Sequence, residues 1–192
     1  MSLSETLIRL YFLLIKLKLL KPILTQKQIS LTVKRLAHQV LENHIGLENT
    51  VLIGIQPRGI FLSDRIVDEL KLLLPVEKIL YGKLDITFYR DDIRTEVKLA
   101  NSTHIPFSTA GKIIIIIDDV LWTGRTTRSA LDALLDFGRP SKVELCVLID
   151  RRFSRELPIQ ADYVGRAIDT FSSQKVYVRW KENFGADEVV LE

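Results

Sequence analysis

The chain has 192 residues, of which 47% are hydrophobic and 27% are charged, and its formal net charge is +3. This length allows one well-buried domain and is short for two. The composition is that of an ordinary globular protein, which excludes a disordered or fibrous chain. The small positive charge permits a nucleic-acid partner without requiring one, because charged patches matter more than totals.

The first segment, residues 7–21, is apolar but carries Arg9, Lys16, Lys18 and Lys21. A membrane-spanning helix requires about 20 mostly apolar residues. A secretory signal requires basic residues ahead of the apolar run and a small-residue cleavage site. Neither pattern is met. We therefore expect residues 1–24 to be an N-terminal extension of unknown role. Membrane contact by residues 7–21, contact with a partner, and sequence upstream of the true start codon all stay open.

Residues 25–43 have the pattern of an amphipathic helix. Thr25 and Gln28 have the spacing of a capping box, in which each side chain accepts a hydrogen bond from the other residue's amide. Apolar residues recur every three or four positions, which predicts one buried face. The opposite face carries charged and polar side chains, including Lys34, Arg35 and His38.

Strands and helices alternate through the rest of the chain. Residues 50–55 form a short apolar run suited to a buried strand, "QPRG" breaks it, and residues 60–74 show helical periodicity. Residues 78–90 alternate as one strand, or as two with a bend at Gly82. The following residues, 90–112, are polar and lack a period, which predicts a long functional loop.

The second half continues the alternation. The isoleucine run "IIIII" at 113–117 predicts a strand, residues 126–138 a helix that ends at Gly138, and residues 142–150 another buried strand. Residues 151–174 read as irregular and basic, and "KVYVRW" and "EVVLE" as late strands. This order predicts an α/β fold with a mostly parallel sheet. The single cysteine, Cys146, cannot form an internal disulfide, which favours a reducing, cytoplasmic setting.

Two adjacent aspartates, Asp118 and Asp119, follow the isoleucine run, and "VLWTGRTT" follows them. Ligands of open parallel sheets bind beyond the carboxyl ends of the strands. The loop supplies backbone amides, threonine hydroxyls and a glycine, and it enters a helix N-terminus that favours an anion. The spacing of a P-loop or a dinucleotide fingerprint is absent. The sequence therefore predicts a phosphate site of another kind.

The acidic pair has two interpretations. Two carboxylates above a phosphate can accept hydrogen bonds from the vicinal hydroxyls of a ribose, with a divalent cation screening their repulsion. Alternatively, Asp118 ends the strand and Asp119 caps the helix. The attached "TGRTT" favours the first interpretation.

The stretch "IIIIIDDVLWTGRT" resembles the phosphoribosyl-pyrophosphate (PRPP) signature of type I phosphoribosyltransferases. Beyond it, "GIQPRGIFL", "LDITFYRDD", "ALLDFGRPSKVELCVLIDR" and "RELPIQADYVGRAI" resemble the bifunctional pyrimidine-operon regulators that have uracil phosphoribosyltransferase activity. The resemblance covers about residues 25–180. One departure is "DRRFSREL", where that family usually has the shorter "DRGHREL".

This resemblance implies the type I phosphoribosyltransferase fold: a mostly parallel twisted sheet flanked by helices, a flexible lid loop and a small hood. Residues 25–192 would form a single phosphoribosyltransferase domain. The implied reaction forms UMP and pyrophosphate from uracil and PRPP, with Mg²⁺ carried by PRPP near Asp118 and Asp119 rather than bound directly by the protein. UMP or UTP are further implied ligands.

The segments take roles in that reaction by resemblance. "QPRG" matches the pyrophosphate loop, residues 90–110 match the lid, and residues 151–176 match the hood that reads the base. The expected catalytic residues are Asp118, Asp119, Arg58 and Arg90, while Asp91 and Asp92 have no assigned role. The expected substrate-binding residues are Pro57, Arg58, Gly59, Asp118, Asp119, Val120, Leu121, Trp122, Thr123, Gly124, Arg125, Thr126, Thr127, Arg151 and Val176.

Trp122 bears on the choice of base. Purine-specific relatives place an aspartate at this position, where it can exchange a proton with the purine ring. A tryptophan can stack on a base but cannot do that chemistry. The sequence therefore favours uracil, with a purine phosphoribosyltransferase as one alternative.

The other alternative is an RNA-binding attenuation regulator with vestigial transferase activity. The resembling family binds pyrimidine-operon leader RNA through a basic surface that includes its first helix, which points to Lys34, Arg35 and His38. A solvated helix face explains the same residues. The family also forms dimers or larger assemblies, so we expect a homo-oligomer.

Overall fold

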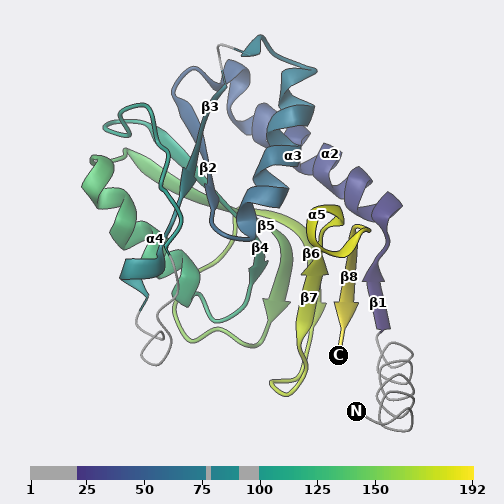
Figure 1. The fold of residues 1–192 in the computed structure, drawn as a ribbon. Coiled ribbons are helices and arrows are strands. Elements are labelled where there is room, and N and C mark those ends of the chain that lie inside the picture. Colours follow the sequence, from purple (N-terminus) through teal and green to yellow (C-terminus); the bar gives the residue numbers. More distant parts are fainter. Residues whose placement is uncertain (1–20, 77–78, 91–99) are drawn as a thin grey trace, which may run out of the picture. The chain divides into compact units, whose positions relative to one another are not determined.

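The computed structural model describes residues 21–76, 79–90 and 100–192 (Figure 1). The chain divides into two compact units: Ser30–Thr170 forms the larger, and the segment ending at Ile29 joins Phe171–Glu192 in the smaller. Most of the expected extension and part of the expected lid, including Asp91 and Asp92, lie outside the described residues. No helix in the described residues is long and apolar enough to span a membrane.

The larger unit is built on a five-stranded sheet in the order β3-β2-β4-β5-β6. All four strand pairings are parallel. The strands are β2 (Thr50–Ile55), β3 (Leu80–Leu84), β4 (Ile113–Leu121), β5 (Lys142–Arg152) and β6 (Tyr163–Asp169). The α/β class and the mostly parallel sheet predicted from the sequence are confirmed.

The isoleucine run lies in β4, the middle strand of this sheet, and it is therefore covered on every side. β4 pairs with β2 on one edge and β5 on the other, and Ile114–Ile117 are fully buried. A strand buried on both faces needs no polar alternation, which explains the unbroken apolar run. In Figure 1, α4 lies on one side of the strands and α3 on the other. The helices are α2 (Gln26–Asn43), α3 (Gly59–Lys71) and α4 (Arg125–Leu134), with short 3₁₀ turns η1 (Ile45–Leu47), η3 (Thr87–Tyr89) and η4 (Leu135–Phe137).

The predicted capping box at the start of α2 is confirmed. The Thr25 amide donates to Gln28 Oε1 at 2.9 Å, and the Gln28 amide lies 3.4 Å from Thr25 Oγ1. The helix predicted over residues 126–138 also ends at Gly138, as expected. α4 continues into η4, and Gly138 ends that turn with φ of +129°. At this φ a side chain is strained, so glycine fits here.

The smaller unit contains a three-stranded antiparallel sheet in the order β1-β8-β7, with a one-turn helix α5 (Lys181–Phe184). β7 (Val176–Arg179) and β8 (Glu188–Leu191) fall on the predicted late strands. Residues 21–24, at the end of the expected extension, form β1 (Lys21–Leu24), which pairs with β8. The run "KPIL" is too short to show a strand period by itself.

Of the two alternatives for residues 78–90, the structure has a single strand without a bend at Gly82, since β3 stays in register with β2 from Leu80 to Leu84. One prediction about the larger unit was wrong. Residues 151–174 were read as irregular, yet they contain β6. This strand pairs only with β5 and is largely exposed along Arg166–Asp169, so it lacks the apolar run that marks the inner strands.

A buried carboxylate lies near the amino end of β5. Glu144 accepts hydrogen bonds from Lys142 Nζ at 2.6 Å and Tyr163 Oη at 2.8 Å, and its Oε2 lies 2.7 Å from His44 Nε2. Burial raises the pKa of Glu144, but the hydrogen bonds from Lys142, His44 and Tyr163 outweigh it, so the net pKa is lowered. This cluster holds the end of α2 against the start of two strands.

Candidate active site

The acidic pair lies inside the last residues of β4 rather than beyond them. Asp118 is 8% exposed and Asp119 is 2% exposed. The Asp119 amide donates to Asp118 Oδ1 at 2.8 Å. Within the described chain, Asp119 Oδ2 accepts no hydrogen bond. A buried carboxylate oxygen of this kind is costly, so it marks a position prepared for a ligand donor or a cation.

The turn after β2 brings a cation to this pair. Arg58 precedes α3, and its Nε lies 3.3 Å from Asp119 Oδ2, while its side chain stays 56% exposed. Gly59 opens α3 against the back of β4: a Cβ there would lie 2.6 Å from the Ile117 carbonyl oxygen and 3.0 Å from Asp118 Cα. Only glycine allows this approach, so Arg58 and Gly59 both lie beside the carboxylates.

Burial makes both carboxylates reluctant to ionise. Burial, together with the negative charge of Asp119, raises the pKa of Asp118 well above its usual range. Burial also raises the pKa of Asp119, and the positive charge of Arg58 opposes part of that rise. Ionising this pair inside the fold therefore costs electrostatic free energy, which hydrogen-bond donors or a cation would offset.

The loop after β4 enters α4 as the sequence predicted. Gly124 has φ of +94° and ends the loop, and Thr123 Oγ1 lies 3.4 Å from the Arg125 amide. Thr127 is buried within the first turn of α4. A Cβ on Gly124 would approach Ile159 Cδ1 at 3.2 Å and Leu157 Cβ at 3.4 Å. The glycine is therefore needed both for its backbone conformation and for packing against residues 157–159.

Trp122 and Arg151 form one contact at the mouth of this loop. The Arg151 guanidinium carbon lies 4.8 Å from the centre of the Trp122 ring, in the geometry of a cation–π pair. Arg151 is only 4% exposed and donates from Nε to Thr170 Oγ1 at 3.0 Å, whereas Trp122 is 47% exposed. Two residues expected at the substrate site are thus in direct contact, and one of them presents an aromatic surface.

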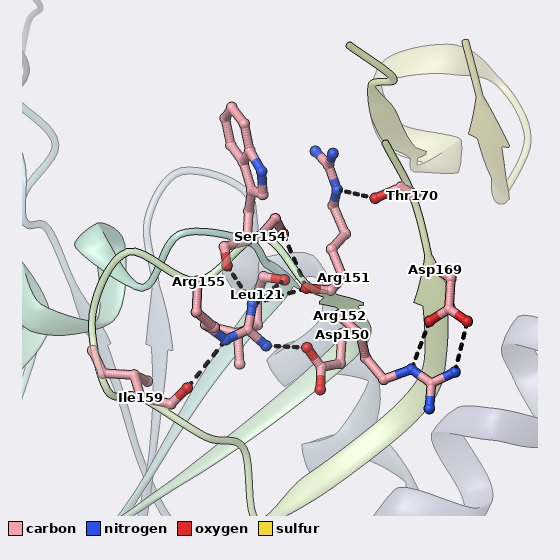
Figure 2. Close-up of polar contacts among 10 residues, drawn as sticks. Leu121, Asp150, Arg151, Arg152, Ser154, Arg155, Ile159, Asp169 and Thr170 are labelled. Carbon is pink, nitrogen blue, oxygen red and sulfur yellow. Dashed lines mark hydrogen bonds and ion pairs between the residues drawn. The ribbon is translucent and has the colours of Figure 1, made fainter. Parts of the chain in front are cut away.

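The segment that departs from the family pattern, residues 150–157, packs on the loop that follows β4 (Figure 2). The Glu156 and Leu157 amides donate to the Thr123 carbonyl oxygen at 3.0 and 3.2 Å. Glu156 Oε2 accepts from Arg125 Nε at 2.7 Å. Arg155 binds carbonyl oxygens of both segments, those of Trp122 and Ile159. None of these contacts was foreseen, because only the fold brings residues 121–125 and 150–159 together.

Asp85, which was also missed, follows β3 and holds the two stems of the long loop. It accepts hydrogen bonds from the Thr87 amide at 2.7 Å and the Asn101 amide at 2.9 Å. Burial raises its pKa, but the hydrogen bonds from Thr87 and Asn101 outweigh it, so the net pKa is lowered. Arg90 comes directly after η3, at the start of the expected lid. Residues 91–99 lie outside the described part, and the contact of Arg90 with pyrophosphate stays a prediction.

The remaining predicted residues lie on other elements. Val176 begins β7 in the smaller unit. Lys34, Arg35 and His38 are exposed on one face of α2, as predicted. The Arg35 guanidinium already donates to the carbonyl oxygens of Val164 at 3.2 Å and Gly165 at 2.5 Å. One residue of this basic face, Arg35, therefore already binds the backbone of β6.

Comparison with known proteins gives a consistent result. The sequence pattern of the phosphoribosyl transferase domain matches residues 20–183. The protein called bifunctional protein PyrR from Elusimicrobium minutum is 47% identical over 168 residues, covering 86% of this chain and 92% of its own. The protein of the same name from Pelotomaculum thermopropionicum is 45% identical over 175 residues, covering 88% and 93%.

Solved structures show the same fold at lower identity. A hypoxanthine phosphoribosyl transferase from Trypanosoma cruzi matches with a TM-score of 0.67 and 19% identity, covering 90% of this chain and 91% of its own. A hypoxanthine-guanine phosphoribosyltransferase from Bacillus anthracis matches with a TM-score of 0.66 and 19% identity, covering 90% and 97%. At this identity the likeness shows the fold alone.

Proposed function

The chain belongs to the phosphoribosyl transferase domain family and, within it, to the group of the bifunctional PyrR proteins, and from this membership we propose that it transfers the phosphoribosyl group of PRPP to uracil. One observation carries the proposal. The buried pair Asp118 and Asp119 ends the central strand beside the Arg58 cation, 3.3 Å from Asp119, and is followed at once by a glycine turn into a helix N-terminus.

The arrangement suits a sugar phosphate because each part matches one group of it. A ribose ring has two vicinal hydroxyls, which can donate to the two carboxylates. The amides and hydroxyls of Thr123–Thr127 at the N-terminus of α4 can hold the 5′-phosphate. Arg58 and the turn at Pro57–Gly59 can bind pyrophosphate, since a guanidinium matches phosphate oxygens with two parallel donors.

In the proposed reaction the base nitrogen forms a bond to C1 of the ribose while the bond from C1 to pyrophosphate breaks, and the proton of that nitrogen is released to the leaving pyrophosphate or to water. Positive charge develops on the sugar, and Asp118 and Asp119 lie where they can stabilise it. Arg58, and Arg90 at the start of the lid, would take up the charge of the leaving pyrophosphate. Little covalent chemistry is required of the protein, and positioning supplies much of the rate.

The residues present also fit the Mg²⁺ that accompanies PRPP in this family. Asp119 Oδ2 is buried without a hydrogen bond, and burial raises the pKa of both carboxyls. A divalent cation near this pair would neutralise charge on the carboxylates and the diphosphate. Asp118 and Asp119 would lie closest to it, with the PRPP oxygens as its main ligands.

Trp122 supports a pyrimidine rather than a purine. Its indole cannot exchange a proton with a purine ring, and its ring already lies against the Arg151 guanidinium. This pair offers a flat surface and a buried cation at the edge where a base would stack. The lone buried thiol, Cys146, suits a reducing compartment, so we infer a cytoplasmic setting.

The test is to incubate the purified chain with PRPP and Mg²⁺ and, in separate reactions, with uracil, hypoxanthine, guanine or xanthine. We expect pyrophosphate and a nucleoside monophosphate to form with uracil alone. Formation of a purine nucleotide would show that the base substrate is a purine and not uracil. Absence of product with every base, in a sample that is folded by circular dichroism, would reject transferase activity.

A second function is favoured by the exposed basic face of α2. We propose that Lys34 and His38 contact the phosphates of a pyrimidine-operon leader RNA. Such contacts provide affinity that depends on salt, without specifying sequence. Arg35 would contribute less, because its guanidinium is engaged by the Val164 and Gly165 carbonyls.

This RNA contact can be tested with the chain's own operon leader. We expect Lys34→Glu to weaken binding and to reduce the slope of log affinity against log salt by about one, with uracil transfer unchanged. Lys71→Glu is the matched control, since Lys71 is exposed at the end of α3 and pairs along its own helix with Asp68 at 2.8 Å. Equal RNA binding by both variants and the unmodified chain would remove the α2 face from the interface.

A further inference from the structure

Arg155 makes an unusual set of contacts for a partly exposed arginine. Its Nε donates to the Ile159 carbonyl oxygen at 3.1 Å, and its Nη1 donates to the carbonyl oxygens of Leu121 at 3.3 Å and Arg151 at 3.0 Å. Nη1 also donates to the Trp122 carbonyl oxygen, and Nη2 pairs with Asp150 Oδ1. One guanidinium therefore joins carbonyls from two separate loops (Figure 2).

These contacts act on the loop proposed to hold the 5′-phosphate. The carbonyls of Leu121 and Trp122 point to Arg155, and the carbonyl of Thr123 points to the amides of Glu156 and Leu157. Three successive carbonyls of this loop are thus held by residues 155–157. The loop has no freedom to rotate these peptide groups without breaking those bonds.

Holding the carbonyls also sets the amides. A trans peptide group is planar, with its N–H directed opposite to its C=O. In the described residues the only cis bond precedes Pro57, so the bonds before Thr123 and Gly124 are trans. Their N–H groups must therefore face away from residues 155–157. That side is where a phosphate at the start of α4 would lie.

We propose that Arg155 is a positioning residue: by holding the Trp122 carbonyl it aims the Thr123 amide at the 5′-phosphate of the substrate, while the Glu156 and Leu157 amides hold the Thr123 carbonyl and so set the Gly124 amide. The inference rests on the proposed function and deepens it. Asp150 completes the arrangement, because its carboxylate balances the guanidinium and fixes its orientation. By also holding the Arg151 carbonyl, Arg155 links the phosphate loop to the segment whose arginine lies against Trp122.

Lysine cannot take this role. A guanidinium is a planar fork with five donors at fixed angles, whereas an ammonium is one compact nitrogen. Arg155→Lys keeps the positive charge beside Asp150 but cannot reach carbonyls on both loops at once. Charge and positioning can therefore be separated by comparing Arg155→Lys with Arg155→Ala.

The experiment measures binding of ribose 5-phosphate, ribose and pyrophosphate to the whole chain by calorimetry, together with KM for PRPP. Losing the aimed Thr123 amide removes one hydrogen bond to a charged phosphate, which corresponds to an affinity about tenfold weaker. We expect that loss for ribose 5-phosphate in both Arg155→Lys and Arg155→Ala, with pyrophosphate binding unchanged. KM for PRPP should rise in parallel, with a smaller change in kcat. Added guanidinium, but not methylammonium, should restore ribose 5-phosphate binding to Arg155→Ala.

Arg152→Lys is the matched control, because the neighbouring Arg152 is directed to Asp169, which it binds through two hydrogen bonds at 2.7 and 2.9 Å. It should bind all ligands as the unmodified chain does. Equal loss for ribose 5-phosphate and pyrophosphate, or full affinity in Arg155→Lys, would overturn the positioning role. If the unmodified chain itself fails to bind ribose 5-phosphate, the proposed function fails instead.

Discussion

Replacing both Asp118 and Asp119 with asparagine is expected to lower kcat/KM for uracil by at least about 100-fold, because the charges that would stabilise the developing cation are removed. Asparagine has the same shape, so the fold should be retained. Steady-state assays of pyrophosphate release measure the effect, and circular dichroism verifies the fold. Turnover close to that of the unmodified chain would reject the assignment of this pair.

The same double variant is expected to be more stable than the unmodified chain at neutral pH. An unfolded aspartate has a pKa of about 3.9, and burial, with the charge of Asp119 acting on Asp118, raises both values in the fold. The stability contributed by the pair is complete below about pH 3.9 and is lost as pH rises through the raised values. The difference in free energy of unfolding between the double variant and the unmodified chain should therefore increase from about pH 4 upward.

Asp85→Asn is the matched control for this pH dependence. Burial raises the pKa of Asp85, but hydrogen bonds from Thr87 and Asn101 outweigh it and lower the net pKa. Its contribution is present above about pH 3.9 and is lost as pH falls through the lowered value. Urea unfolding across pH should thus show destabilisation at neutral pH for Asp85→Asn. A double variant that follows the same trend would contradict the raised pKa values of the acidic pair.

Gly59→Ala is expected to damage both stability and turnover. The added Cβ would lie 2.6 Å from the Ile117 carbonyl oxygen and 3.0 Å from Asp118 Cα, so either α3 or β4 must move. Such crowding costs about 1–3 kcal/mol of unfolding free energy. Because Asp118 and Arg58 move with these elements, we expect kcat/KM to fall by about 100-fold.

Gly111→Ala separates crowding from backbone strain. A Cβ at Gly111 would meet no atom within 4 Å, although its φ of +71° disfavours alanine. This variant should lose about 1 kcal/mol or more of stability and keep its turnover. Urea unfolding and steady-state kinetics on both variants decide the matter. If Gly59→Ala matches Gly111→Ala in turnover, the close approach of α3 to β4 does not position the site.

Local patterns predicted the elements whose cause is local. The capping box at Thr25 and Gln28 fixes the start of α2, and the isoleucine run marks a strand covered on both faces. The position of Asp118 and Asp119 at the carboxyl edge of the sheet followed from a general property of parallel sheets, whereas the role of Arg58 was implied by the family resemblance of "QPRG".

Contacts between distant segments could not be read in this way. Asp85 clamps two stems that lie 16 residues apart at Asn101, and Arg155 binds the Trp122 carbonyl 33 residues away. Nothing in "LDITFY" or "RRFSREL" indicates these partners, because they are set by the fold and not by spacing. β6 was missed for a related reason: its pairing with β5 holds it in place, while its second half is largely exposed and shows no apolar run.

The cluster around Glu144 has a consequence for engineering heat tolerance. Its carboxylate is matched by Lys142, His44 and Tyr163 at the rim of the sheet opposite the acidic pair. Substitutions that stabilise this rim can raise the thermal stability of the fold without changing the residues proposed to bind the ribose. A thermotolerant variant should therefore be sought at the rim around Glu144 first, and the opposite rim with Asp118 and Asp119 should be left unchanged.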